Sequence, residues 1–215
     1  RIANARLAAV CDVREEAAAK LAGENGVPYF TSVGEMVRGD VVDAVTIGTP
    51  SGFHLESALE AIEAGKHVLS EKPLEITTER IDRIIAAADR KRVKLAGVFQ
   101  SRFTSIIRRL KKLVDGGLLG ELYTVSAYLK RYRPQSYYDS AGWRGTWKVD
   151  GGGCLMNQGI HHVDLLQWFA GAVDEVIAMT ETMGRKVEVE TVAMRLLKFA
   201  NGARGVIEGT TLAYP

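Results

Sequence analysis

Polar side chains follow three apolar stretches of the sequence, at the point where each stretch ends. RLAAVC is followed by Asp12, VVDAVTI by the loop that carries Thr49 and Pro50, and HVLS by Glu71, Lys72 and Pro73. A carboxylate at the first of these places can accept hydrogen bonds from both hydroxyl groups of an adenosine ribose. Each place also has an ordinary structural explanation: a helix cap or surface acid, a loop, and a solvated lysine. The elements that carry these residues decide between the two explanations.

The first half of the sequence alternates apolar stretches with helical patterns. Strands are predicted at 6–11, 41–47, 67–70 and 93–99, and helices at 14–25, 54–65 and around 81–88. The buried faces of the last two helices would consist of Leu55, Ala58, Leu59 and Ile62, and of Ile81, Ile84, Ile85 and Ala88. Nearly continuous apolar strands are typical of a parallel sheet covered on both faces. The pattern predicts a Rossmann-like doubly wound parallel sheet, in which ligands bind beyond the carboxyl ends of the strands.

The pattern changes after about residue 120. Residues 121–132 alternate with period two, and further strands are predicted at 173–182, 187–199 and 203–212, the last two joined by the hairpin signal Asn201-Gly202. One clear helix, at about 159–170, would pack against the resulting sheet. We therefore predict two domains. Residues 1–100 form the dinucleotide-binding domain, and residues 101–215 form an α+β domain with an open, mainly antiparallel sheet.

Composition excludes several classes of function. The net charge of +2 gives no electrostatic footprint for nucleic acid, and the basic run at 108–112 has the spacing of a solvated helix face. Cys11 and Cys154 match no zinc or redox spacing, so no metal is expected and a reduced, cytoplasmic location fits. No apolar run approaches the roughly 20 residues that a membrane-spanning helix needs. Neither nucleic acid nor a membrane is therefore expected as a partner.

A fourth segment, DGGGCLMNQGIHHVDLLQWFAG at 150–171, completes a set of motifs. The others are GTPSGFH at 48–54, EKP at 71–73, FQSRF at 99–103, GELYTV, and FANGARG at 199–205. Together they resemble the Gfo/Idh/MocA family of nicotinamide-dependent sugar and cyclitol oxidoreductases. The resemblance covers nearly the whole chain. It implies a sugar-type substrate, NAD or alternatively NADP as cofactor, and a homodimer or homotetramer formed through the C-terminal sheet.

The resemblance also assigns roles to single residues. Cofactor contacts would come from Asp12, Arg14, Thr49, Pro50, His54, Glu71, Lys72 and Gln100. Lys72 would face the nicotinamide and a substrate hydroxyl, and the bond before Pro73 is often cis in relatives, which aims the lysine into the cleft. His161 matches the family's catalytic histidine, in a pattern that Gly159 and Asp164 complete, while the neighbouring His162 points elsewhere on the helix.

The chemistry of a dehydrogenase needs two such groups. Hydride leaves a carbinol carbon only as its hydroxyl proton is removed, so a base must reach that oxygen. His161 suits this role, because a place in the first turn of a helix would favour the neutral ring, and Lys72 would stabilise developing alkoxide charge. Asp164 would either orient the histidine or cap the helix. The alternative for His161 is a histidine that merely packs on an apolar helix.

Two features depart from the family pattern. Many relatives carry an aspartate four residues before the histidine, where this chain has Asn157 followed by Gln158. Asn157 is therefore expected to hydrogen-bond the substrate, as in the subset resembling UDP-N-acetylglucosaminuronic acid 3-dehydrogenases. The family's glycine turn should also precede Asp12 by about 20 residues, and no Gly-x-Gly-x-x-Gly is present. We expect the chain to lack this loop and part of the C-terminal domain.

The segment 130–147 is rich in arginine and aromatic residues, which can stack on sugars and pair with carboxylate or phosphate. Arg131, Tyr138, Trp143 and Arg144 are thus candidates for substrate binding, together with Asn157 and His161; an oligomer interface or a loop core is the alternative for the aromatic residues. Three functions stay open: an NAD(P)-dependent sugar or cyclitol dehydrogenase, which we favour, an NAD-dependent glycosidase of the same family, and a non-catalytic nucleotide-binding regulator.

Overall fold

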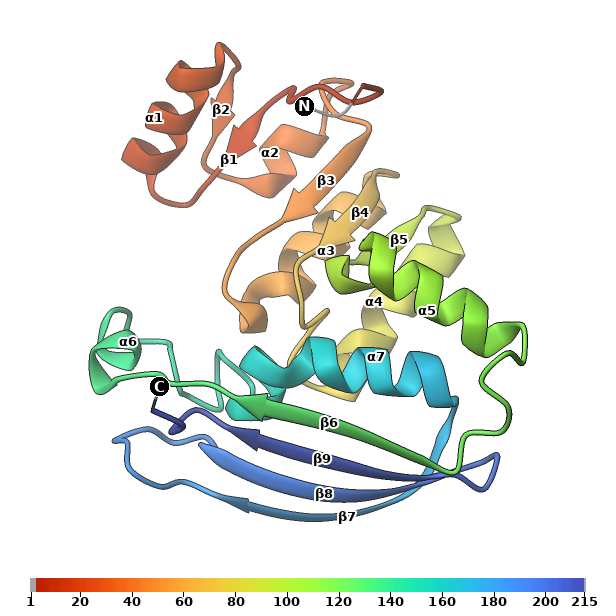
Figure 1. The fold of residues 1–215 in the computed structure, drawn as a ribbon. Helices are drawn as coiled ribbons and strands as arrows, with labels where there is room; N and C mark the ends of the chain where they lie inside the picture. The colour runs from red at the N-terminus through yellow and green to blue at the C-terminus, as the bar shows by residue number, and fades with distance from the viewer. Residues whose placement is uncertain (1–2, 215) are drawn as a thin grey trace. The chain divides into compact units, whose positions relative to one another are not determined.

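The computed structural model describes residues 3–214, so Arg1, Ile2 and Pro215 lie outside the described part of the chain. The chain divides into two compact units (Figure 1). The first comprises residues 1–49 and 53–97, and the second comprises residues 50–52 and 98–215. Each unit is described by itself below.

All strands of the first unit pair in parallel, as the sequence predicts, but they form two sheets. β1 (Val10–Cys11) pairs with β2 (Tyr29–Phe30), while β3 (Ala44–Ile47), β4 (His67–Ser70) and β5 (Leu95–Gly97) form a separate sheet in the order β3-β4-β5. The strands predicted at 6–11, 41–47 and 93–99 are therefore too long. A residue joins a strand only where a neighbour bonds its backbone, and the sequence pattern does not show where such neighbours end.

Helices cover these strands. They are α1 (Glu15–Asn25), the short α2 (Val33–Val37), α3 (His54–Glu63), preceded by a 3₁₀ turn at Ser51–Phe53, and α4 (Thr78–Lys91). The predicted apolar faces of α3 and α4 pack into one core with Val45, Ile47 and Val68 of the strands. Ile85 is an exception, because its side chain is 43% exposed. The prediction placed it on the inner face, which around the centre of α4 consists of Ile84, Ala87 and Ala88.

The second unit is built on one four-stranded sheet. It contains β6 (Thr124–Lys130), β7 (Val173–Glu181), β8 (Val192–Phe199) and β9 (Arg204–Thr210), in the order β6-β9-β8-β7. Two pairs are antiparallel, as predicted, and β6 pairs with β9 in parallel. The hairpin between β8 and β9 turns at Gly202, whose φ of 90° favours glycine. The sheet is therefore mixed, and mainly antiparallel.

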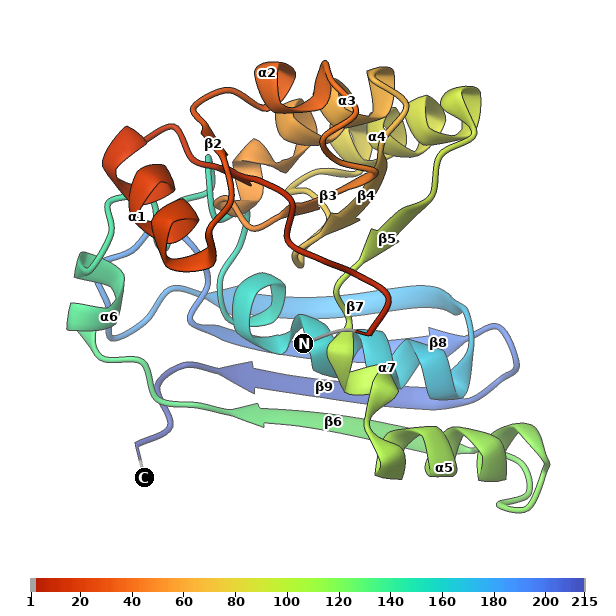
Figure 2. The ribbon, with the colours of Figure 1, turned by 90° about the horizontal axis from the view of Figure 1, so that it is seen from above.

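α7 (Ile160–Ala170) lies along one face of this sheet (Figure 2). Leu166 and Ala170 of α7 pack against Phe199 and Ile207 of the sheet and against Ala203 of the turn between β8 and β9. The remaining helical segments are the 3₁₀ turn Gln100–Phe103, α5 (Ser105–Asp115) and α6 (Gln135–Asp139). The basic run at 108–112 lies on α5, which buries no residue, so its placement on a solvated helix face is confirmed. Within residues 3–214, no helix combines the length and the apolar character that crossing a membrane requires.

Candidate active site

The Glu-Lys-Pro segment begins where β4 ends. The N–H of Glu71 donates to the carbonyl of Ile47 at 2.9 Å, which extends the pairing of β4 with β3 by one residue. The chain then leaves the sheet, and the bond between Lys72 and Pro73 is cis. Lys72 is half-buried and its N–H donates to the Glu71 carboxylate at 3.2 Å. The backbone of the lysine is thus held close to the carboxyl end of the strand.

His54 connects this segment with the loop that follows β3. Its ring is 1% exposed, and its nitrogens Nδ1 and Nε2 each lie 2.9 Å from a backbone carbonyl oxygen, that of Pro73 and that of Thr49. The sequence indicated a cofactor contact for this histidine. In the structure the ring is buried and holds the two loops together.

Glu75 fixes the other side of the same segment. Its side chain is fully buried and accepts hydrogen bonds from the N–H groups of Leu55 (3.3 Å) and Ile76 (2.5 Å). The guanidinium of Arg80 pairs with it at 2.9 Å and also bonds the exposed Glu56. Removing one partner of such a buried pair typically costs about 3–5 kcal/mol. The sequence did not reveal this pair, because an acid and an arginine five residues apart carry no signal of burial.

Asp12 stands directly after β1. Its carboxylate accepts from the backbone N–H of Arg14 at 2.8 Å and from Nε of the same side chain at 3.4 Å. The backbone hydrogen bond is the main reason that the pKa of this carboxyl lies below its usual value, so Asp12 is charged at neutral pH. Among the other predicted cofactor contacts, Thr49 and Gln100 are exposed and Pro50 is half-buried.

In the second unit, the glycine run leads into a π-helix at Cys154–Gly159, which continues into α7. The Glu190 carboxylate accepts from the N–H groups of Gly153 (2.8 Å) and Leu155 (3.1 Å), and its backbone carbonyl accepts from Cys154 (2.9 Å). A Cβ on Gly153 would lie 1.8 Å from that carbonyl oxygen. The glycine therefore permits a close backbone contact that any side chain would block.

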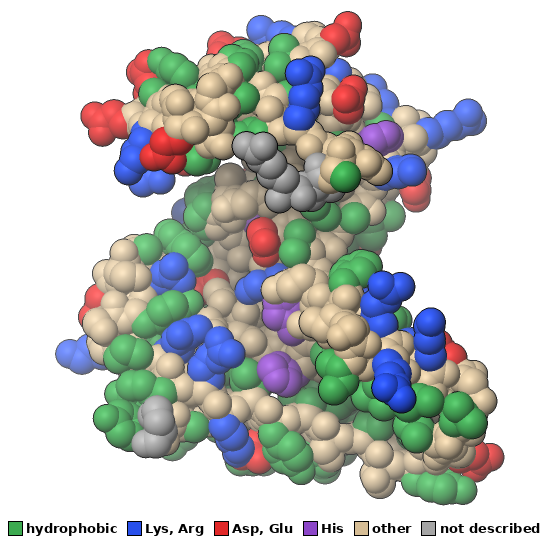
Figure 3. Space-filling model, turned by 45° about the horizontal axis from the view of Figure 1, so that its top comes forward, with side chains coloured by type: hydrophobic (Ala, Val, Ile, Leu, Met, Phe, Trp, Pro, Cys, Tyr) green, Lys and Arg blue, Asp and Glu red, His purple; other side chains and the backbone are tan. Residues whose placement is uncertain are grey.

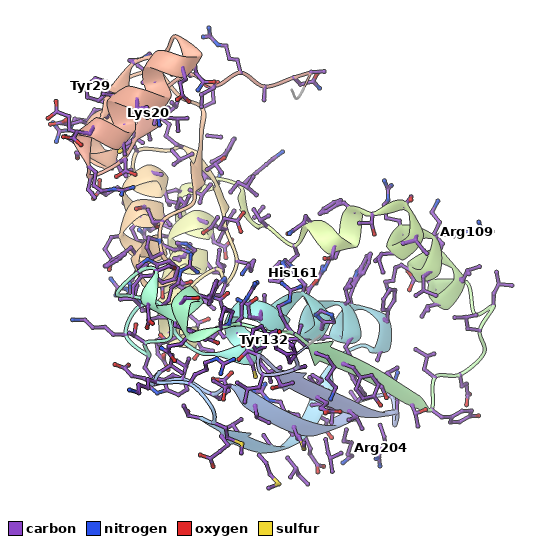
Figure 4. All side chains as sticks on the ribbon, turned by 60° about the vertical axis from the view of Figure 1, so that its left-hand side comes forward. Lys20, Tyr29, Arg109, Tyr132, His161 and Arg204 are labelled. Carbon is purple, nitrogen blue, oxygen red and sulfur yellow. The ribbon has the colours of Figure 1, made fainter. Side chains whose placement is uncertain are left out.

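The π-helix changes the prediction for His161. Because helical backbone precedes it from Cys154 onward, His161 does not lie at a free helix N-terminus, where the sequence placed it. The ring is half-buried and meets Phe99 edge to face, with 6.0 Å between centroids (Figure 4). Phe99 belongs to the FQSRF motif, so this motif helps to orient the histidine.

Asp164 pairs with Arg102 of the same motif. Nε of Arg102 lies 2.8 Å from Oδ2 of Asp164, and Nη2 donates to Oδ1. The guanidinium also lies 5.2 Å from the centre of the Trp168 ring. Asp164 does not cap α7, since Gly159 occupies the N-cap and no side chain bonds there. Its observed role is to hold the FQSRF motif on the helix.

Asn157 and Gln158 anchor a polar network on the π-helix. The amide nitrogen of Asn157 donates to the buried Asp150, and its oxygen accepts from Nε2 of Gln158 at 2.8 Å. Gln158 also donates to the hydroxyl of Tyr137 at 3.1 Å and accepts from Arg133 at 2.8 and 3.2 Å. The sequence singled out neither Arg133 nor Tyr137, although both lie in the segment that it marked.

The four residues predicted to bind substrate from this segment differ in environment. Arg131 is exposed, and Arg144 stacks on Trp143 at 4.7 Å and donates to the hydroxyl of Tyr137 at 2.8 Å. Tyr138 is only 8% exposed, donates to Thr211 at 3.1 Å, and has its pKa raised by burial. Tyr138 therefore belongs to the loop core, which was the alternative for this residue.

No group of three or more His, Cys, Asp or Glu side chains within residues 3–214 could hold a metal ion. The thiol of Cys154 is fully buried, and burial raises its pKa to about 12, so it is a packing residue.

Two family models match the chain. Residues 1–99 match the oxidoreductase family with an NAD-binding Rossmann fold, and residues 107–215 match the GFO/IDH/MocA C-terminal domain. Rhizopine catabolism protein MocA of Rhizobium meliloti is 29% identical over 94% of this chain and 62% of its own length. Myo-inositol 2-dehydrogenase of Thermotoga maritima is 28% identical over 99% of this chain and 63% of its own length.

Solved structures share the fold. The WlbA dehydrogenase from Bordetella pertussis, in complex with NADH and UDP-GlcNAcA, is 39% identical and has a TM-score of 0.94. The alignment covers 98% of this chain and 64% of that one. The chain therefore spans less than two thirds of the length of these relatives, and the agreement includes both the Rossmann unit and the mixed sheet.

Proposed function

The chain belongs to the GFO/IDH/MocA oxidoreductase family, and from this premise we propose that it transfers a hydride between a hydroxyl-bearing carbon of a sugar, nucleotide sugar or cyclitol and a nicotinamide cofactor. The observation that carries the proposal is the match of family models to both halves of the chain, in combination with Lys72 and His161 at the two motif positions. Residues 1–100 would bind the cofactor, and residues 101–215 would bind the substrate.

The proposal assigns separate tasks to the two groups. His161 takes the proton of the reacting hydroxyl, and the Lys72 ammonium stabilises the negative charge that develops on the same oxygen. Phe99 limits the positions of the imidazole ring, and the hydrogen bond to Glu71 limits those of the lysine backbone. Asn157 would contact a substrate hydroxyl, because an amide donates and accepts hydrogen bonds but takes no proton.

The residues present fit an adenosine ribose. Asp12 offers a charged carboxylate at the end of β1, and Arg14, Thr49, Pro50 and Gln100 would complete the cofactor contacts. NAD, when bound, supplies the hydride acceptor or donor. Glu71 would act through the backbone of Lys72, and His54 through the two loops whose carbonyls its ring meets.

The intact protein is expected to reduce NAD with at least one sugar-type alcohol, followed as NADH absorbance, and to prefer NAD over NADP. Charged Asp12 accepts the ribose hydroxyls and repels a 2′-phosphate, although Arg14 softens this bias. The ratio of kcat/KM for the two cofactors measures the preference, and Asp12→Asn should reduce it. A tenfold or greater preference for NADP would contradict the role of Asp12. Hydrolysis of a chromogenic glycoside without net NADH would contradict the dehydrogenase.

We further propose that the open face of the C-terminal sheet joins copies of the protein into a homodimer or homotetramer. This face exposes large apolar side chains, among them Ile177 at 70%, Met179 at 76% and Leu196 at 57%. Ile177→Lys should therefore shift the intact protein toward the monomer in sedimentation velocity. Val13→Lys, at a position 87% exposed on the first unit, is the matched control. A monomeric wild-type protein, or an unchanged assembly in Ile177→Lys, would refute the interface.

A further inference from the structure

Several arginines gather around the segment 131–144 without a carboxylate partner. No Asp or Glu of residues 3–214 lies within ion-pair distance of Arg131, Arg133, Arg144 or Arg185. The acids nearest in the chain bond other groups, since Asp139 accepts from Gln135, buried Asp150 from Gly145 and Asn157, and Glu188 from Trp147. Figure 3 shows Lys and Arg side chains gathered on part of the visible face.

Two of these arginines lie on the same side of an extended segment. The N–H of Arg131 donates to the carbonyl of Thr210, the N–H of Arg133 donates to that of Thr211, and Tyr132 between them forms an antiparallel bridge with Leu212, so the backbone stays extended beyond the end of β6. Alternate residues of a strand point to the same face, and Leu129, two positions earlier, is buried there. Arg131 and Arg133 therefore share the face of the sheet that α7 covers.

The helix presents matching groups at that face. Arg133 bonds Gln158, and the charge of Arg131 acts on His162, one helical turn further along. Burial and this charge lower the pKa of His162, and its Nδ1 has no hydrogen-bond partner among residues 3–214. Gln158 and His162, four residues apart, lie next to Asn157 and His161 on the surface of the helix.

The guanidinium groups are held in place by neutral partners. The Cζ atoms of Arg133 and Arg144 each lie 4.6 Å from the centre of the Tyr137 ring. Gln158 accepts from two N–H groups of Arg133, and Tyr137 accepts from one of Arg144. A guanidinium has five N–H donors, so both arginines keep donors for a carboxylate or phosphate group. Two positive charges on one ring also repel each other, and a bound anion would relieve this.

We propose that Arg131, Arg133 and Arg144 form an anion-binding site beside His161, so that the substrate is a sugar carrying a phosphate or carboxylate group. The inference rests on the proposed function and narrows its substrate class. A neutral hexose or cyclitol would leave the positive charge of these arginines without an anionic partner. Phosphate and carboxylate groups both accept paired hydrogen bonds from a guanidinium. The anionic group could therefore belong to a sugar phosphate, including a nucleoside diphosphate sugar, or to a sugar acid.

Calorimetric titration of the intact protein with NADH present tests the site without turnover. The probes are UDP-glucuronic acid, UDP, glucuronate, glucose 6-phosphate, glucose and myo-inositol, each titrated into the wild-type protein. At least one anionic probe should bind ten times or more tightly than the neutral ones. UDP and glucose 6-phosphate distinguish a phosphate source from the carboxylate of glucuronate.

Arg133→Gln and Arg131→Gln should each lower the affinity for the anionic probe roughly tenfold or more. Added salt should lower the affinity of the wild-type protein for the same probe. Arg131 is exposed, so its variant tests the site even where Arg133→Gln fails to fold. Arg204→Gln is the matched control, because Arg204 bonds only backbone carbonyls near the start of β9 (Figure 4). Equal binding of anionic and neutral probes, or unchanged affinity in the Arg131 and Arg133 variants, would overturn the site. Anion binding without any sugar oxidation would refute the proposed reaction alone.

Discussion

Replacing Lys72 with methionine is expected to lower kcat by about a hundredfold or more while the melting temperature stays nearly unchanged. The side chain that is lost stabilises developing charge on the reacting oxygen, and removal of one such preorganised partner typically costs 10²- to 10³-fold. Methionine keeps much of the apolar stem, and the buried contacts of the segment belong to Pro73, His54 and Glu75. Steady-state kinetics at saturating substrate and thermal melting measure the two quantities.

Lys20→Met is the matched control, since Lys20 is an exposed lysine of α1 (Figure 4) and should keep wild-type kinetics. Cofactor affinity should largely survive in Lys72→Met. If that variant retains more than half of the wild-type turnover, Lys72 has no catalytic role. If its melting temperature falls strongly, the lysine serves the fold instead.

His161→Asn is expected to reduce kcat/KM for alcohol oxidation by roughly 10²- to 10⁴-fold, the usual range for loss of a general base. In the wild-type protein this parameter should rise with pH through one ionisation, because only the neutral ring accepts the hydroxyl proton. That ionisation should be absent in the variant. Asparagine has the same side-chain atoms as histidine as far as Cγ and keeps a polar group beyond it, so the helix should persist.

The pH profile separates a base from a packing residue, because a histidine that only packs would change stability without removing an ionisation. His67→Asn, at an exposed histidine of β4, is the matched control and should keep the wild-type profile. Activity retained in His161→Asn with an unchanged profile would assign the proton to another group. Lys72, the other group proposed at the reacting oxygen, would then be the candidate base.

Local patterns predicted much of the fold. The stripe of α3, the alternation of β6 and the Asn201-Gly202 turn are encoded within a few residues, and the structure contains all three. The Glu-Lys-Pro stop after β4 could be found for the same reason, because β4 ends at Ser70 and the motif follows at once. Elements whose residues lie close together in sequence are readable in this way.

Contacts between distant residues were not predictable. The ring of His54 between two carbonyls, the buried Glu75 with Arg80, and the bonds of Glu190 to the π-helix each depend on segments brought together by folding. A run of glycines followed by an apolar helix does not show which backbone will approach it. The sequence marked Arg131 and not Arg133 as a candidate for substrate binding, although two residues so spaced on a strand lie on one face.

The contact of Glu190 with the start of the π-helix also affects how the helix that carries His161 can form during folding. Its first amides bond a residue 35 and 37 positions away, so a loop of that size must close before those bonds are gained. Most helices nucleate from neighbouring residues. These capping bonds form only when the chain before β8 arrives, an event of the slow, non-local kind. The start of the helix that carries Asn157 and His161 is therefore capped through sheet assembly and not by neighbouring residues.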